Sequence, residues 1–173
     1  MAGMSTLPWL MPGIVISILL ALLASQAFGR ILATRPAIAW VILVGLGVVI
    51  SATLTPLQDA SGVVTSGNGA CDLSRLGFAP IASLLQVDDT SLNILLFIPL
   101  GMGIGMLRGS GRKAILFAVA LALPLSIEGI QLLVPFLERG CQSADVIDNV
   151  TGLLIGVGMG TGARFVGTRF RGA

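Results

Sequence analysis

Polar side chains that could bind a ligand or do chemistry lie at the ends of three long apolar segments. Glu128 lies inside one such segment, and Arg139 lies just beyond its end. The planar guanidinium of arginine can bind a phosphate or a carboxylate through two parallel hydrogen bonds. Carboxylates and carboxamides can bind hydroxyl and amide groups. The candidate set is Asn93, Glu128, Gln131, Arg139, Asp145 and Asn149.

The composition excludes an ordinary soluble domain. Of the 173 residues, 55% are hydrophobic and only 10% are charged, and the mean hydropathy is +0.99. About a quarter of the residues of a soluble domain are charged. The formal net charge of +2 does not indicate a nucleic-acid partner, because the basic residues are scattered between apolar runs and form no single patch. We therefore expect a multi-pass protein of the cell membrane.

Five apolar runs predict an all-α bundle of five transmembrane helices. Each run is about long enough to cross a hydrocarbon core ~30 Å thick. Helices are favoured because a backbone in lipid must satisfy its own hydrogen bonds, and the runs lack the alternation of a barrel. The third run is the shortest, so we expect it to extend into its flanks or to be tilted or broken near Pro99. The expected spans of this single membrane domain, residues 1–173, are 10–28, 37–55, 92–107, 114–135 and 146–166.

The distribution of Lys and Arg predicts the orientation. Eight of the ten basic residues fall in the connection after the first span, the connection after the third span and the C-terminal tail, which must share one side. Cytoplasmic loops carry the excess of Lys and Arg, so we expect the N-terminus outside and the C-terminus in the cytoplasm. The segment before the first span has no positive side chain, so we expect an uncleaved span and not a secretory signal. All eight acidic residues then lie outside or in the outer half of a span.

Both cysteines are predicted to face the oxidising, outer side. Cys71 lies in the connection after the second span, and Cys141 lies in the connection after the fourth. Disulfides persist in such a compartment, so we expect a bond between them, with two free thiols as the alternative. The chain has no His, and two Cys alone make a poor zinc set. We therefore expect no metal site and no cofactor.

The long connection between the second and third spans has two parts. Residues 56–77 are rich in Gly, Ser, Asp and Asn, which predicts coil. The sequence FAPIASLLQV that follows has Pro80 at a first helical position and apolar residues on one face, which predicts a short helix at the membrane surface. Such a helix could cover an outer-facing site or simply anchor the loop.

Glycines recur at intervals of four residues in two of the spans. Small residues at this spacing let helix backbones approach closely, so we expect them to pack helices and not to bind a ligand. Packing within one chain and packing between two copies are both open. The glycines are Gly101 and Gly105 in the third span, and Gly152, Gly156 and Gly160 in one register of the fifth, with Gly158 and Gly162 in another.

The candidate polar residues are expected to converge on the outer third of the bundle. Glu128 lies seven residues before Pro135, which puts it about 10 Å below the outer end of its helix. A carboxylate at that depth is costly unless it is paired or faces water, so it indicates a functional site, and Arg139 is the expected partner. A purely structural ion pair is the alternative. Asp145 and Asp148 could cap a helix N-terminus, and for Asp148 we favour that structural role.

The order of these residues resembles the VanZ-like membrane proteins. The resemblance rests on NILLFIPLG from residue 93, SIEGIQ from residue 126 and RGCQSADVIDNVTGLLIG from residue 139. Some family members have an acidic residue where Gln142 stands here, which argues against a site that needs a third carboxylate in that loop. The founding member is associated with low-level resistance to the glycopeptide teicoplanin. The resemblance thus implies a bacterial plasma-membrane protein of the cell envelope with a link to antibiotic resistance.

Two functions remain as hypotheses. In the preferred one, the pocket binds the head group of an envelope lipid or a lipid-linked wall precursor, with Arg139 on phosphate and the carboxylate and carboxamide groups on hydroxyl or amide groups. In the other, a membrane enzyme hydrolyses or transfers such a head group, with Glu128 as general base, Arg139 stabilising phosphate charge and Asp145 holding a cation. A transporter is disfavoured, because the five spans show no internal repeat.

Overall fold

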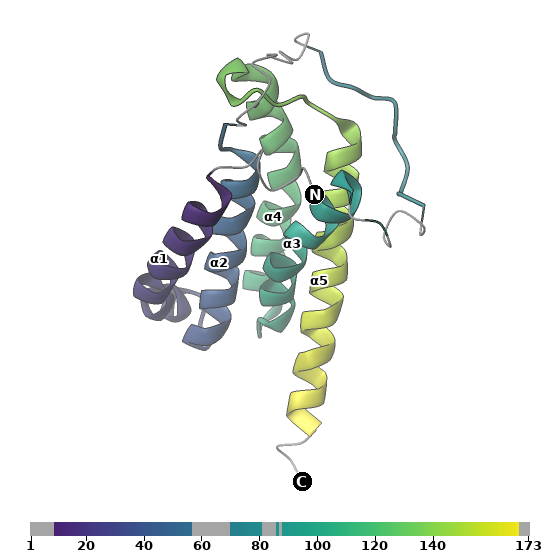
Figure 1. The fold of residues 1–173 in the computed structure, drawn as a ribbon. Helices are drawn as coiled ribbons and strands as arrows, with labels where there is room; N and C mark the ends of the chain where they lie inside the picture. Colours follow the sequence, from purple (N-terminus) through teal and green to yellow (C-terminus); the bar gives the residue numbers. More distant parts are fainter. Residues whose placement is uncertain (1–8, 57–69, 81–85, 87, 170–173) are drawn as a thin grey trace.

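The described part of the chain folds as a bundle of five long helices (Figure 1). The structure is a computed structural model that describes residues 9–56, 70–80, 86 and 88–169. All five helices are long and apolar enough to cross a membrane, which confirms the expected fold class. A short 3₁₀ helix, η2, links the last two. The elements are α1 (Leu10–Ile31), α2 (Pro36–Thr53), α3 (Asp89–Met106), α4 (Ser110–Leu133), η2 (Pro135–Leu137) and α5 (Ser143–Arg169).

Local sequence explains how α3 begins and continues. The Asp88 carboxylate accepts a hydrogen bond from the Ser91 amide at 2.9 Å, and the Ser91 hydroxyl accepts one from the Asp88 amide at 3.1 Å. This capping box starts the helix three residues before the expected span. The helix also runs through Pro99 without interruption. The short third span therefore extends into its flank, and it is not broken at the proline.

The connections define two ends of the bundle. We call the end that carries Cys71 and Cys141 the disulfide end; η2 and the starts of α3 and α5 lie there. We call the opposite end the arginine end; it carries the α1–α2 turn, the α3–α4 turn and the C-terminal part of α5, at the bottom of Figure 1. The disulfide end is the one that the distribution of Lys and Arg predicts to face outside. That orientation stays a prediction.

Glycines bring α3 and α5 into backbone contact. A Cβ atom added to Gly156 would lie 3.0 Å from the Cα of Gly101, and one added to Gly160 would lie 3.1 Å from the Cα of Gly105. Added at Gly152, it would collide with the Ile94 carbonyl. The first glycine register of α5 therefore packs within the chain. In the second register, a Cβ added at Gly158 or Gly162 would have no neighbour from another described element within 4 Å.

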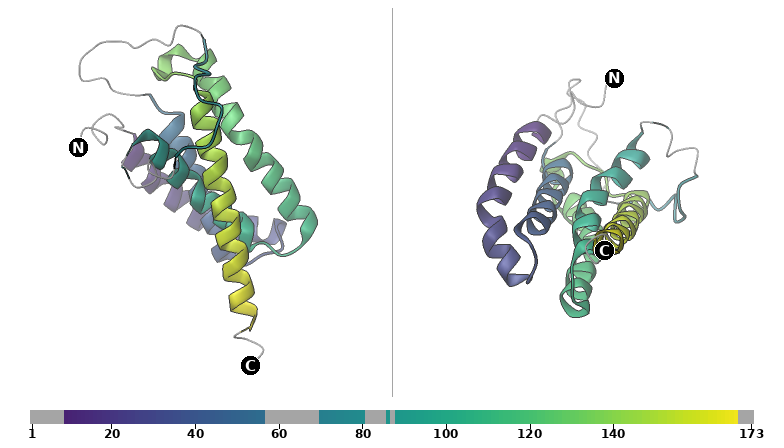
Figure 2. Two further views of the ribbon diagram at one scale, coloured as in Figure 1. Left: turned by 90° about the vertical axis from the view of Figure 1, so that its right-hand side faces the viewer. Right: turned by 90° about the horizontal axis from the view of Figure 1, so that it is seen from below.

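The remaining helices pack outward from this pair. Gly45 of α2 lies against the backbone of Leu100 on α3, and α1 packs on α2. A buried apolar core that includes Phe97, Ile104 and Leu153 joins α3 to α5 and to its other neighbours. The right-hand view in Figure 2 shows α1 and α2 lying together on one side of α3 and α5. The α3–α5 pair is thus the centre of the bundle: α2 packs on α3, and α1 packs on α2.

Two predicted features fall outside the described residues. The expected surface helix spans FAPIASLLQV, and most of it, residues 81–85 and 87, is not described. The three residues that begin this sequence, 78–80, form no helix. The chain before Trp9, on which the prediction of an uncleaved first span partly rests, also lies outside the described residues.

We predict that adding a single methyl group to Gly156 will destabilise the bundle. In Gly156→Ala the new Cβ collides with the Ile98 carbonyl of α3, and overpacking of this kind costs about 1 to 3 kcal/mol. Gly158→Ala is the matched control, because a Cβ at Gly158 would meet no other part of the described chain within 4 Å. The free energy of unfolding of the purified protein in mixed micelles measures the effect. An equal loss in both variants would contradict the α3–α5 contact.

Candidate functional site

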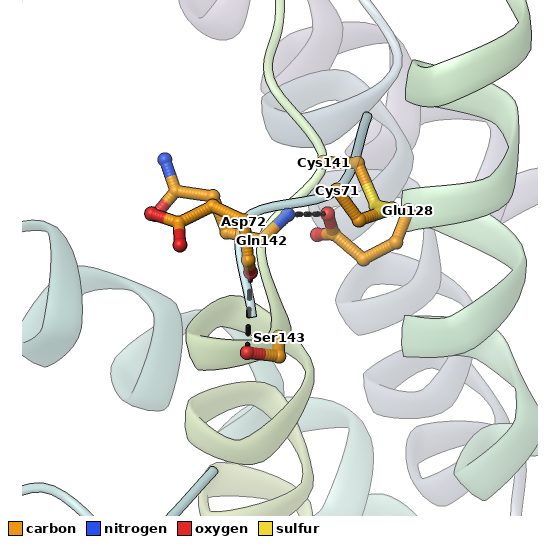
Figure 3. Close-up of a disulfide and its surroundings, with 6 residues drawn as sticks. All are labelled: Cys71, Asp72, Glu128, Cys141, Gln142 and Ser143. Carbon is orange, nitrogen blue, oxygen red and sulfur yellow. Dashed lines mark hydrogen bonds between the residues drawn. A yellow bond between two sulfur atoms is a disulfide. The ribbon is translucent and has the colours of Figure 1, made fainter. Parts of the chain in front are cut away.

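A disulfide fastens the α2–α3 connection to the start of α5. Cys71 and Cys141 are bonded, with their Cα atoms 4.6 Å apart, which confirms the predicted pairing. The Asp72 amide donates to the Cys141 carbonyl at 2.8 Å, and the Ser143 amide donates to the Asp72 carbonyl at 2.9 Å. The Ser143 hydroxyl also donates to the Asp72 carbonyl, as Figure 3 shows. This short bridge fixes the backbone directly beside Glu128.

Glu128 is held by a backbone amide. Its side chain is only 5% exposed and lies beside the disulfide (Figure 3). The Oε2 atom accepts a hydrogen bond from the amide of Gln142 at 2.7 Å. Glu128 stands five residues before the end of α4, which corresponds to about 7.5 Å at 1.5 Å per residue. The buried carboxylate at the disulfide end is therefore positioned by the disulfide-linked segment.

Arg139 lies between α4 and α5 and does not pair directly with Glu128. Its Nε donates to the Thr55 carbonyl at 3.1 Å. Its Nη2 is buried and has no hydrogen-bond partner among the described residues. Burial lowers the pKa of the Arg139 guanidinium, and the negative charges of Asp145 and Glu128 oppose that shift. Arg139 thus interacts with both carboxylates through its charge. The ion pair expected between Arg139 and Glu128 does not form within the described chain.

Gln131 joins α4 to the end of α2. Its side chain is buried, and Nε2 donates to the Thr53 carbonyl at 2.9 Å. Arg139 binds the Thr55 carbonyl in the same way. The last carbonyls of a helix have no partner within that helix. Gln131 therefore satisfies a terminal carbonyl of α2, and Arg139 satisfies a carbonyl two residues beyond the end of that helix. Gln131 follows Glu128 by three residues, so the two lie on the same face of α4.

An ion pair that sequence reasoning missed joins the connection to α5. Arg75 Nη1 donates to Asp148 Oδ1 at 3.0 Å, and Nη2 contacts Oδ2 of the same carboxylate. Asp148 is 1% exposed and Arg75 is 28% exposed. The carboxylate raises the pKa of the Arg75 guanidinium above its usual range. The only sequence signal was one basic residue in a long connection, and 73 residues separate it from its partner.

The remaining candidate residues come from α3 and α5. Asn149 is 1% exposed, and its Oδ1 has no partner among the described residues. Asp145 is partly buried, and the side chain of Asn93 on α3 lies beside its carboxylate. Within the described ranges, no group of three His, Cys, Asp or Glu side chains gathers that could hold a metal ion.

The disulfide end thus contains a buried to partly buried group of polar residues, which we call the Glu128–Arg139 cluster; Asn149 belongs to it by its position one turn after Asp145 on α5. It comprises two carboxylates and one guanidinium that interact through their charges, together with two carboxamides from α3 and α5. Two of its polar atoms, one donor and one acceptor, are buried without a partner in the described chain. The members are Asn93, Glu128, Arg139, Asp145 and Asn149.

Comparison with known proteins identifies the family. The profile of the family described as VanZ/LLP1 matches residues 9–164. The chain belongs to the VanZ/LLP1 family. The match runs from α1 to α5, so it includes the two helices that lie before the segments carrying the sequence resemblance. No curated protein matches the chain, and no solved structure does. VanZ/LLP1 is a family of membrane proteins, which agrees with the five apolar helices of the described chain.

We predict that Arg75→Gln will destabilise this VanZ/LLP1 protein through Asp148. The substitution leaves the buried Asp148 carboxylate without its cation. Breaking a buried ion pair lowers the free energy of unfolding by about 3 to 5 kcal/mol, and we expect a loss of about 3 kcal/mol here. The lower end applies because Arg75 is partly exposed. Unfolding in mixed micelles measures the loss, and the double variant Arg75→Gln/Asp148→Asn should recover part of it. Equal losses for the single and double variants would argue against the pair.

We also predict that the disulfide stabilises the fold. The bond closes a loop of 70 residues, and the chain-entropy relation gives about 4 kcal/mol for a loop of that length. The variant Cys71→Ser/Cys141→Ser and the reduced wild type should therefore unfold at similarly lower denaturant. Labelling with a maleimide after denaturation provides the check on the bond itself. Reactive thiols in the unreduced wild type would contradict the pairing.

Proposed function

We propose that this VanZ/LLP1 protein binds the head group of an envelope lipid or a lipid-linked wall precursor at the Glu128–Arg139 cluster. One observation supports this above all: Arg139 Nη2 and Asn149 Oδ1 are buried and lack partners in the described chain. A buried polar group left without a hydrogen bond costs about 1 to 3 kcal/mol. A ligand that accepts from the guanidinium and donates to the carboxamide would remove that cost at both atoms.

The charges of the cluster restrict the kind of head group. Arg139 offers a donor suited to a phosphate oxygen, but Glu128 and Asp145 both lie in its electrostatic range. Two carboxylates would repel a ligand that carries phosphate alone. A head group with a phosphate and also hydroxyl or amide donors suits the cluster better, because the donors can bind the carboxylates and Asn149. Lipid-linked sugars and amide-bearing wall precursors have this combination.

The location of the cluster also supports the proposal. Glu128 lies within about two helical turns of the end of α4, at the end that the distribution of Lys and Arg predicts to face outside. A site this close to the end of the bundle can be reached by the head groups of lipids on that face. Engagement of a wall precursor here would be one route to the teicoplanin resistance associated with the founding VanZ-like member, and we include that link in the proposal.

We predict that Arg139→Gln will weaken binding of a purified polyprenyl-linked disaccharide wall precursor. Loss of one hydrogen bond from a charged donor costs about 2 kcal/mol, or roughly thirtyfold in affinity. The measurement is titration of the precursor into the protein in phosphatidylcholine nanodiscs. Bare polyprenyl phosphate should bind more weakly than the sugar-bearing precursor. Unchanged affinity in Arg139→Gln would remove the proposed phosphate contact.

Two control variants complete this experiment. Arg112→Gln removes an exposed arginine at the opposite end of the bundle and should leave precursor affinity unchanged. Glu128→Gln keeps an acceptor for the Gln142 amide but cannot act as a base. Binding retained in Glu128→Gln, with no conversion of the precursor by the wild type, supports a binding protein. Conversion by the wild type that Glu128→Gln abolishes would instead indicate the enzyme.

A further inference from the structure

A cavity of about 720 Å³ lies at the arginine end, away from the Glu128–Arg139 cluster. Three parts of the chain enclose it: the α1–α2 turn, the end of α3 and the C-terminal part of α5. The right-hand view in Figure 2 looks onto this end of the bundle. A volume of that size falls within the range of about 300 to 1,000 Å³ typical of small-molecule sites.

Four arginines from four separate segments line this cavity. Arg30 comes from the last turn of α1, Arg35 from the position before α2, Arg108 from the α3–α4 turn and Arg164 from α5. A purely topological role requires only that basic residues stay on one side of the membrane. It does not require arginines from four separate segments to line one cavity. We call these residues and the space between them the arginine cavity.

The arginine cavity has no counter-ion within the described chain. No acidic residue is among the residues that line it. Like charges gathered in one place repel one another, so a bound anion would lower the energy of the site. The described acidic residues all belong to segments of the disulfide end, namely Asp72, Asp88, Asp89, Glu128, Glu138, Asp145 and Asp148.

The four guanidinium groups differ in what already holds them. Arg164 Nη1 donates to the Leu107 carbonyl at 2.8 Å, which satisfies a carbonyl at the end of α3. Its guanidinium also lies 5.5 Å from the centroid of the Phe165 ring. Within the described chain, Arg30, Arg35 and Arg108 form no hydrogen bond and no ion pair through their side chains. Three guanidinium groups are therefore available for a ligand.

We propose that the arginine cavity binds a phosphate group, carried either by an anionic lipid head group or by a soluble phosphate compound. Guanidinium groups bind phosphate oxygens through paired, charge-assisted hydrogen bonds. Gln26 and Thr34, which also line the cavity, add groups that can bind hydroxyls next to the phosphate. Basic pockets between transmembrane helices on the cytoplasmic side are suited to anionic lipid head groups. The bound phosphate would bridge the end of α1 and the α3–α4 turn.

The experiment compares two nearby exposed arginines, Arg108 in the α3–α4 turn and Arg112 in the first turn of α4. Arg108 lines the cavity, whereas Arg112, four residues later, is exposed and does not line it. Purified protein in phosphatidylcholine nanodiscs, with or without phosphatidylglycerol, is analysed for retained phosphatidylglycerol by native mass spectrometry. Inorganic phosphate and glycerol 3-phosphate are titrated separately into the protein in phosphatidylcholine alone. Both arms are repeated for Arg108→Gln, Arg30→Gln/Arg108→Gln and Arg112→Gln.

We expect retained phosphatidylglycerol in the wild type and in Arg112→Gln, and a loss of about tenfold in apparent affinity in Arg108→Gln. The double variant should lose more, and added salt should weaken binding in the wild type. Binding of phosphatidylglycerol would show that the phosphate comes from a lipid head group. Binding of the soluble phosphates alone would show that it comes from a soluble compound. Binding of neither ligand, or an equal loss in Arg108→Gln and Arg112→Gln, would overturn the proposal. Because all the substituted residues are exposed, the unfolding midpoint should stay unchanged and verifies the fold of each variant.

Discussion

The close approach of α3 and α5 is the constraint on which the rest of the bundle depends. Their backbones meet through glycines on both helices, and a side chain at Gly101, Gly156 or Gly160 would not fit between them. In a membrane, helices associate through close packing and hydrogen bonds, because lipid is as apolar as their side chains. The pair also carries the polar groups of both ends: Asn93, Asp145 and Asn149 at one, and Arg164 at the other.

The two ends of the bundle differ in whether their charged side chains have partners. At the disulfide end, two carboxylates are buried: Arg75 pairs with Asp148, and the Gln142 amide donates to Glu128. A covalent bond fixes the segment that supplies these partners. At the arginine end, the cavity collects cations without any anion from the described chain. We propose a head group with phosphate and hydroxyl or amide groups as the ligand of the first end, and a phosphate group as the ligand of the second.

The sequence predicted much of the fold because local patterns control it. Apolar run length gave the five helices, and Glu128 and Gln131 share a face because three residues are almost one helical turn. The Arg75–Asp148 pair was not predictable in the same way, since no local rule connects residues 73 positions apart. The role expected for Arg139 also changed: its Nε binds the Thr55 carbonyl, because the end of α2 lies beside the α4–α5 connection.

By itself, the sequence determined the membrane bundle, its five spans, the candidate cysteine pair and the residues of the Glu128–Arg139 cluster. These follow from hydropathy, helical spacing and the separation of charges along the chain, which are properties of short segments. Only the tertiary structure decided which glycine register packs within the chain, which arginine neutralises Asp148 and which arginines share a cavity. Each of those depends on helix ends brought together from distant positions, and the close packing of α3 against α5 decides where those ends meet.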